Sequence, residues 1–277
     1  HQFVHGLFDQ SVDGDHLDVY GSIEAVKEAF SLFLEQTKED GYQVIQKSYE
    51  SFATSRVITY SLADKTADVY ASSYNLEKDG QVFLISASDE EYKLRLGGEH
   101  NMENAIAALT AAQLAGCDDK TLAKALYTFK GIKRRFEYIA QGENWVFIDD
   151  YAHHPTEVAA LLAAIRKMYP SHEIVAVFQP HLYSRTRDLA KAFAKALDAA
   201  DKTYVLPIYP AREEPLEGVY SQLIIHAMHK EAKGVSGDHW FARLPLEGSV
   251  VYVTIGAGSI EHVVEPLSQF LNDKRKT

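Results

Sequence analysis

The strongest constraint on the fold is a series of apolar strands in the second half of the chain. Residues 146–148, 174–178 and 250–255 are apolar almost throughout, and residues 203–206 are similar. Helical patterns alternate with them, near residues 188–199, 221–230 and 260–270, and the clearest begins at Pro155. Strands without a polar side must be covered on both faces, which is typical of parallel sheets wound with helices. We therefore predict an α/β fold with a mostly parallel sheet here.

The first half of the chain has a different pattern. Apolar residues at helical spacing predict a helix over 22–36. Runs of β-branched and aromatic residues predict short strands at 44–45, 57–60 and 82–84, with a hairpin turn at Asp79-Gly80. Two more helices are expected at 101–114 and 119–129. The change of pattern places a domain boundary near residue 132, which gives domains of residues 1–131 and 132–277.

Composition excludes several classes of protein. The net charge of -11 argues against a nucleic-acid groove and against an anionic membrane surface as partner. Cys117 is the only cysteine, so the chain forms no internal disulfide, which fits a reducing compartment. We find no apolar run of about 18 residues and no signal-peptide pattern. These features predict a cytoplasmic, soluble protein.

The densest polar cluster runs from Asp149 to Glu157, with the order Asp-Asp-Tyr-Ala-His-His-Pro-Thr-Glu. It lies where a predicted strand ends and a helix begins, the usual ligand-binding position of open α/β sheets. Capping of the helix by His154 or Thr156 would explain one or two of these polar residues, but not all of them. We interpret the cluster as functional.

Two further clusters contain arginine. The segment 178–187 follows another predicted strand, and there Arg185 could bind a carboxylate or phosphate, whereas Arg187 fits a solvated helix face. Because both polar clusters follow strands that we presume to be neighbours, we expect Asp150, Tyr151, His153 and Arg185 to converge on one cleft that faces the first domain. Residues 133–135 (Lys-Arg-Arg) lie at the predicted domain junction, and such a run is either a solvated face or a phosphate site.

Three signals are weaker. Asn101 could be a helix N-cap, and Asp15-His16-Leu17-Asp18 contains possible metal ligands. Gly256-Ala257-Gly258 looks like the start of a dinucleotide fingerprint, but the rest of that motif does not fit in the residues that follow. A tight strand–helix turn is the better interpretation of those glycines.

Together, in order and spacing, these segments resemble the Mur ligase family, from about Asp15 to the carboxy terminus. The resemblance implies part of a central ATP-binding domain over 1–131 and a Rossmann-like ligase domain over 132–277. It further implies ATP-dependent joining of L-alanine to UDP-N-acetylmuramate in peptidoglycan precursor synthesis, with ATP and Mg²⁺ required. Neither nucleic acid nor a membrane is an expected partner.

The same resemblance implies roles for individual residues. His16 corresponds to a residue that helps bind magnesium. The adenine contacts would be His100 and Asn101, the phosphate contact Arg135 and the ribose contact Asp150. The muramyl carboxylate and the incoming alanine would meet Tyr151, His153 and Arg185. Arg135, His153 and Arg185 are therefore the expected catalytic residues.

Some features depart from the family pattern. Leu182 stands where many members have an arginine, and Ser259 where aspartate is common. The phosphate-binding sequence Gly-x-x-x-x-Gly-Lys-Thr/Ser does not occur in the 277 residues. We therefore expect this chain to be part of a longer enzyme, without its UDP-binding domain and phosphate loop, and inactive by itself.

Other functions remain open. A related family ligase attaches a recycled tripeptide to the same sugar nucleotide. A non-catalytic nucleotide-binding module is a different class, although the Asp149–Glu157 cluster is intact. A nicotinamide oxidoreductase is the third alternative, and the incomplete fingerprint argues against it.

Overall fold

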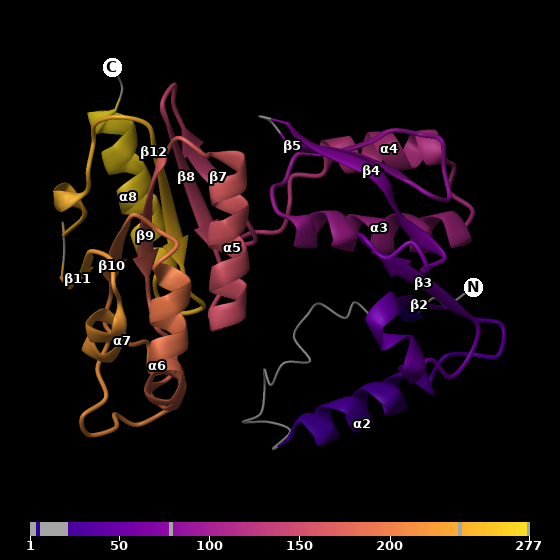
Figure 1. The fold of residues 1–277 in the computed structure, drawn as a ribbon, viewed down its shortest axis with the longest axis horizontal. Coiled ribbons are helices and arrows are strands. Elements are labelled where there is room, and N and C mark those ends of the chain that lie inside the picture. The colour runs from indigo at the N-terminus through magenta and orange to yellow at the C-terminus, as the bar shows by residue number, and fades with distance from the viewer. Residues whose placement is uncertain (1–3, 6–21, 78–79, 238–239, 276–277) are drawn as a thin grey trace. The chain divides into compact units, whose positions relative to one another are not determined.

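The computed structural model describes residues 4–5, 22–77, 80–237 and 240–275. The segment 15–18, which includes the predicted magnesium ligand His16, lies outside these ranges. The chain divides into two compact units, residues 1–130 and 131–277 (Figure 1). Each unit has its own sheet, and each is described by itself.

The first unit contains a six-stranded sheet in which the strands follow one another in chain order. Its strands are β1 (Val4–His5), β2 (Gln43–Gln46), β3 (Val57–Ser61), β4 (Val69–Glu77), β5 (Gly80–Ile85) and β6 (Tyr92–Leu94). Neighbours are parallel from β1 to β4 and antiparallel from β4 to β6. Glu77 lies opposite Gly80, which confirms the predicted hairpin. The sequence patterns missed the short strands β1 and β6, and also β4, because much of β4 is polar and exposed.

Helices cover this sheet. They are α2 (Ile23–Leu34), the 3₁₀ helix η1 (Lys47–Phe52), α3 (Glu99–Leu114) and α4 (Asp119–Thr128). The larger core lies between the strands and α3 with α4, and includes Phe83, Tyr92 and Ile106. A smaller cluster around Leu34 and Ile45 joins α2 to β2 and η1. The helices agree with prediction to within two residues at either end, and one 3₁₀ helix was missed.

The second unit contains a six-stranded sheet in the order β11-β10-β9-β12-β8-β7. Its strands are β7 (Glu137–Gln141), β8 (Trp145–Asp150), β9 (Glu173–Phe178), β10 (Lys202–Val205), β11 (Ala232–Gly234) and β12 (Val250–Ile255). All neighbours are parallel except β7 and β8, which confirms the predicted mostly parallel sheet. One expectation was wrong. β8 and β9 are not neighbours, because β12 pairs with both.

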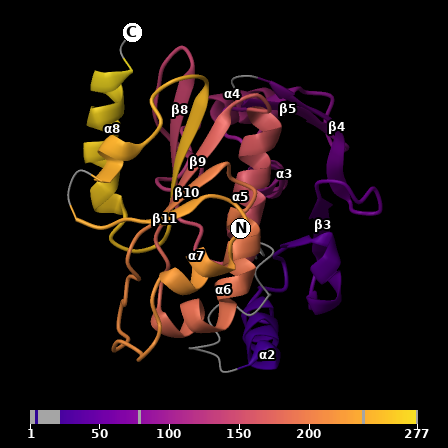
Figure 2. The ribbon, with the colours of Figure 1, turned by 60° about the vertical axis from the view of Figure 1, so that its left-hand side comes forward.

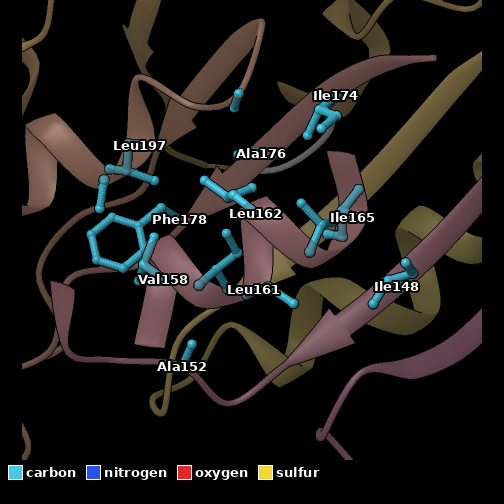
Figure 3. Packing of buried hydrophobic residues seen from close by; sticks show 14 of the residues in the cluster. Ile148, Ala152, Val158, Leu161, Leu162, Ile165, Ile174, Ala176, Phe178 and Leu197 are labelled. Atoms are coloured by element: carbon cyan, nitrogen blue, oxygen red, sulfur yellow. The ribbon is translucent and has the colours of Figure 1, made fainter. Parts of the chain in front are cut away.

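Alternate residues of the strands enter two separate cores. Ile148, Ala176 and Phe178 face α5 (Pro155–Met168), α6 (Tyr183–Leu197) and α7 (Gln222–Ala227) (Figure 3). Phe147, Val177 and Tyr252 face the other side, with α8 (Glu261–Lys274) and η2 (Trp240–Arg243). Figure 2 shows α8 on one side of the sheet and α5 to α7 on the other.

This arrangement determines where a ligand can bind. The helices that follow β8 and β9 cover one face, and the helix that follows β12 covers the opposite face. The connections therefore diverge on both sides of β12 at its carboxyl end. Crevices in open α/β sheets form at such positions. No helix of the described residues is long and apolar enough to cross a membrane.

Candidate functional site

Asp149 is the residue before the last of β8, and its carboxylate is hydrogen-bonded within the fold. Its Oδ2 accepts a hydrogen bond from Arg134 Nε at 3.2 Å, and its Oδ1 accepts one from Thr254 Oγ1 at 2.5 Å. Only 2% of the residue is exposed. Burial raises the pKa of this carboxyl, against the opposite effects of Thr254 and Arg134. Asp149 thus joins β8, β12 and the junction segment.

The carboxylate of Asp150 is also hydrogen-bonded through both of its oxygens. Its two carboxylate oxygens accept the backbone N–H groups of Phe136 at 2.7 Å and Ala152 at 2.8 Å. Burial raises the pKa of the carboxyl to about 6, although these two hydrogen bonds and the charge of Arg135 favour ionisation. Asp150 therefore anchors Phe136 beneath the strand end. Any contact with a ribose would use its remaining lone pairs.

His153 lies at the start of α5, where Glu157 organises the turn. Glu157 Oε2 accepts the backbone N–H groups of His153 at 2.8 Å and His154 at 3.0 Å. His154, one of the two capping residues considered from the sequence, is the N-cap residue, and Pro155 is the first residue of the helix. The Nδ1 atom of His153 lies 3.0 Å from the carbonyl oxygen of Tyr151, so its ring is oriented by the turn. The ring packs edge-on against Tyr151, at a centroid distance of 5.4 Å.

The second arginine cluster does meet the first polar cluster. Arg185 Nη1 donates to the carbonyl oxygen of His153 at 3.3 Å. The ring of His181 lies 6.0 Å from that of His153 and stacks on Tyr209 at 5.7 Å. The predicted convergence of His153 and Arg185 is therefore confirmed, although their strands are separated by β12.

Helix α6 begins earlier than expected. Predicted from about Asp188, it starts at Tyr183, so Arg185 lies in its first turn. The carboxylate of Glu213 accepts the backbone N–H of Ser184 at 3.0 Å and also its hydroxyl. Arg187 is exposed and pairs with Asp188 at 2.7 Å, which confirms that it is a solvated helix-face charge.

The loop after β12 closes the edge of the site. Gly256 has a φ of 150°, and an added Cβ would lie 2.9 Å from the carbonyl oxygen of Gln179. Gln179 holds the loop through Ser259 Oγ at 3.1 Å and the N–H of Ile260 at 2.8 Å. Helix α8 follows at once, so the glycines form a tight strand–helix turn, as predicted.

The basic run at 133–135 is not uniform. Lys133 and Arg135 are exposed, whereas Arg134 is only 8% exposed and binds Asp149 and the carbonyl oxygen of Gly256. The interpretation of the whole run as a solvated face is therefore wrong for Arg134.

The predicted adenine contacts lie in the first unit, at the start of α3. Gly98, with a φ of 91°, is the N-cap residue, so the N-cap interpretation of Asn101 was wrong. Asn101 Nδ2 donates instead to the carbonyl oxygen of Gly97 at 2.7 Å. Buried Gln81 supports the same turn by donating to the carbonyl oxygens of Leu96 and Gly98 at 2.8 and 2.9 Å.

Several residues of these networks were not found from the sequence. Arg134, Gln179, Tyr209 and Glu213 all hold the strand ends or the helix starts in place. Only Arg134 and Gln179 lie within the clusters identified from the sequence, at 133–135 and 178–187. Their burial depends on partners that are distant in the chain. Within the described ranges, no group of three or more histidine, cysteine or acidic residues is arranged to hold a metal ion.

Comparison with known proteins gives consistent matches. Residues 5–112 match the Mur ligase middle domain, and residues 134–245 match the glutamate ligase domain of Mur ligases. The UDP-N-acetylmuramate–L-alanine ligase of Flavobacterium johnsoniae is 37% identical over 95% of this chain. The enzyme of the same name from Christiangramia forsetii is 38% identical over 94%. The chain spans 58% of the length of each of these relatives.

Solved structures show the same fold. The UDP-N-acetylmuramate–alanine ligase of Thermotoga maritima aligns with a TM-score of 0.75 and 24% identity, over 94% of this chain and 58% of that one. A murein peptide ligase from Psychrobacter arcticus aligns with a TM-score of 0.59 and 20% identity, over 90% and 55%. With its middle domain followed by its glutamate ligase domain, this chain belongs to the Mur ligase family.

Proposed function

We propose that the chain is part of an ATP-dependent ligase that joins L-alanine to UDP-N-acetylmuramate in peptidoglycan precursor synthesis. The observation that carries this proposal is the 37–38% identity, over nearly the whole chain, to curated ligases of that name. The meeting of Tyr151, His153 and Arg185 at one sheet edge supports it. The enzyme would act in the cytoplasm, where its nucleotide substrates are made.

The proposed reaction has two steps. The carboxylate of the sugar nucleotide first attacks the γ-phosphorus of ATP, which forms an acyl phosphate and ADP. The amine of alanine then attacks the acyl carbon, and phosphate leaves as the amide forms. A carboxylate oxygen leaves poorly until it is phosphorylated, which is why ATP is needed. Transfer of the phosphoryl group depends mainly on positioning and charge stabilisation.

Individual residues of the second unit suit these steps. Arg135 is exposed and can meet the transferring phosphoryl group. Arg185 donates to the carbonyl oxygen of His153, and a guanidinium at this place suits a carboxylate, which it can bind with paired hydrogen bonds. Tyr151 and His153 present ring edges and polar atoms beside it. We assign Tyr151, His153 and Arg185 to the muramyl carboxylate and the incoming alanine.

The nucleotide and metal contacts are part of the same proposal. Asn101 donates to Gly97, which leaves its Oδ1 atom to accept from the adenine amino group, with His100 beside it. Asp150 would meet the ribose. Magnesium, when bound, would neutralise phosphate charge, and its proposed ligand His16 lies outside the described residues.

The test uses the protein expressed from its complete coding sequence. With magnesium-ATP and UDP-N-acetylmuramate, we expect L-alanine to be ligated far faster than a cell-wall tripeptide. A preference for the tripeptide would favour the recycling ligase instead. If the protein forms no ATP-dependent product with L-alanine or with the tripeptide, both assignments are contradicted.

A further inference from the structure

Arg134 is buried, and every nitrogen of its guanidinium is engaged. Nε donates to Asp149 at 3.2 Å, Nη1 lies 3.5 Å from Oε2 of Glu261, and Nη2 donates to the carbonyl oxygen of Gly256. These partners lie at the end of β8, at the start of α8 and in the loop after β12. A planar guanidinium can satisfy three directions at once, which a lysine ammonium on a flexible stem does not reproduce.

The backbone at this residue is unusual. Arg134 and Phe136 have φ values of 61° and 50°, which non-glycine residues rarely adopt. The N–H of Arg134 donates to Glu137 Oε2, and the N–H of Phe136 donates to Asp150 Oδ2, both at 2.7 Å. Phe136 is fully buried. Strained conformations persist where the surroundings hold them, so the exposed Arg135 lies between two anchored residues.

Arg134 also holds the segment that carries Tyr151. Its carbonyl oxygen accepts the N–H of Tyr151 at 2.7 Å, and its guanidinium carbon lies 5.1 Å from the centroid of the Tyr151 ring. That ring contacts His153. One buried side chain therefore connects the turn of Arg135 to the segment 151–153.

We propose that Arg134 is a positioning residue, which sets the placement of Arg135 relative to Tyr151 and His153. The inference rests on the proposed function, because it takes Arg135 to be the cation that meets the phosphoryl group. If Arg134 only neutralised Asp149, a lysine at this position would serve as well.

The kinetic test compares variants of the complete protein. Arg134→Lys keeps the charge but loses the three-way contact, so we expect kcat to fall about 10- to 100-fold, since small misplacements are costly in phosphoryl transfer. The KM for L-alanine should change little, whereas the thermal midpoint should fall modestly because the carbonyl oxygen of Gly256 loses its donor. Combined with Arg135→Ala, the substitution should lower kcat no further than Arg135→Ala alone, because Arg134 acts through its neighbour.

Arg166 offers a matched control. It binds Asp201 at 2.5 Å and the carbonyl oxygen of His172 at 2.8 Å, at the opposite ends of the strands from the site. Arg166→Lys should leave kcat unchanged. Wild-type kcat in Arg134→Lys would overturn the inference, and so would losses that multiply in the double variant.

A second measurement requires no turnover. Trypsin cleaves after exposed Arg135 only if the turn opens, so Arg134→Met should speed cleavage at that bond while Arg166→Met should not. If the complete protein ligates nothing, the proposed function fails, and this measurement still decides the anchoring role. Unchanged cleavage in Arg134→Met would overturn it.

Discussion

At the scale of single residues, the site contains buried charges that the fold itself uses. Asp149 and Asp150 are 2% and 6% exposed, and both accept hydrogen bonds from the junction segment or from β12. Removing such carboxylates from water disfavours ionisation, which raises the pKa of each. Both carboxylates therefore stabilise the ends of the strands, and any contact with a ligand would be additional to these hydrogen bonds.

Asp150 gives a pH-dependent prediction. Its folded pKa of about 6 lies above the ordinary 3.8, so the ionised form is disfavoured in the folded state. The resulting loss of folding stability is absent at pH values below the ordinary pKa, and it is complete at pH values above about 6. As the pH rises from about 4 to 7, the free energy of unfolding of the wild type should fall relative to Asp150→Asn, by up to about 3 kcal/mol. Urea unfolding of both proteins at several pH values measures this, and a constant difference would contradict it.

Arg135 gives a kinetic prediction for the complete enzyme. If it meets the phosphoryl group mainly in the transition state, Arg135→Ala should lower kcat by roughly 10²–10³-fold and raise the KM for ATP much less. Lys133→Ala, an exposed neighbour, should stay within about twofold of wild type. Normal turnover with weaker ATP binding would make Arg135 a ground-state contact instead.

At the scale of elements, two helices of the second unit, α5 and α6, begin at the site and are capped by carboxylates. Glu157 caps α5 from within its own first turn, whereas Glu213 caps α6 from a distant loop. Both carboxylates satisfy backbone N–H groups that a helix start would otherwise leave free, and both lie at its positive end. These caps fix where His153 and Arg185 stand.

The cap on α6 can be tested. Glu213→Ala should lower the free energy of unfolding by about 1 kcal/mol, and exposed Glu214→Ala by much less. Burial opposes ionisation of Glu213, but its hydrogen bonds from Ser184 hold the pKa of this carboxyl below its ordinary 4.5. The stabilisation is therefore present above that pH and lost as the pH falls below it. An equal effect of both substitutions at neutral pH would show that Glu213 is not a cap.

Local signals predicted the elements well, and distant partners account for the errors. Helix α5 was placed correctly because Pro155 marks its start within the sequence itself. The start of α6 was placed five residues late because its capping carboxylate, Glu213, is 29 residues away from Ser184. Arg134 looked like part of a solvated run because its partner Gly256 lies 122 residues further along. The pairing of β12 with β8 and β9 has no local signal either.

At the scale of the whole chain, two units with separate cores contribute different parts of the proposed enzyme. The first contains the proposed adenine contacts, and the second contains the proposed phosphate and substrate contacts. The 277 residues do not contain the phosphate-loop sequence, whose N–H groups and lysine hold the β- and γ-phosphates of ATP. Contacts with base and substrate alone do not transfer a phosphoryl group.

We therefore expect the 277 residues alone to ligate no alanine. Mixed with magnesium-ATP, L-alanine and UDP-N-acetylmuramate, they should release ADP far more slowly than the complete protein. The measurement is ADP release by coupled assay, with the complete protein as the positive control. Release on the order of one per second or faster, typical of a kinase, would contradict the expectation.

β12 is the last described strand to be synthesised, yet it pairs on both of its sides. While the ribosome is still adding residues 179–249, the facing edges of β8 and β9 have no partner, and most residues of both strands are apolar. Open apolar edges are where newly made chains aggregate or recruit chaperones. A stop codon before residue 250 would therefore divide the sheet into two parts, β11-β10-β9 and β8-β7, each with an unpaired edge. We expect such a truncated chain to be degraded rather than to accumulate.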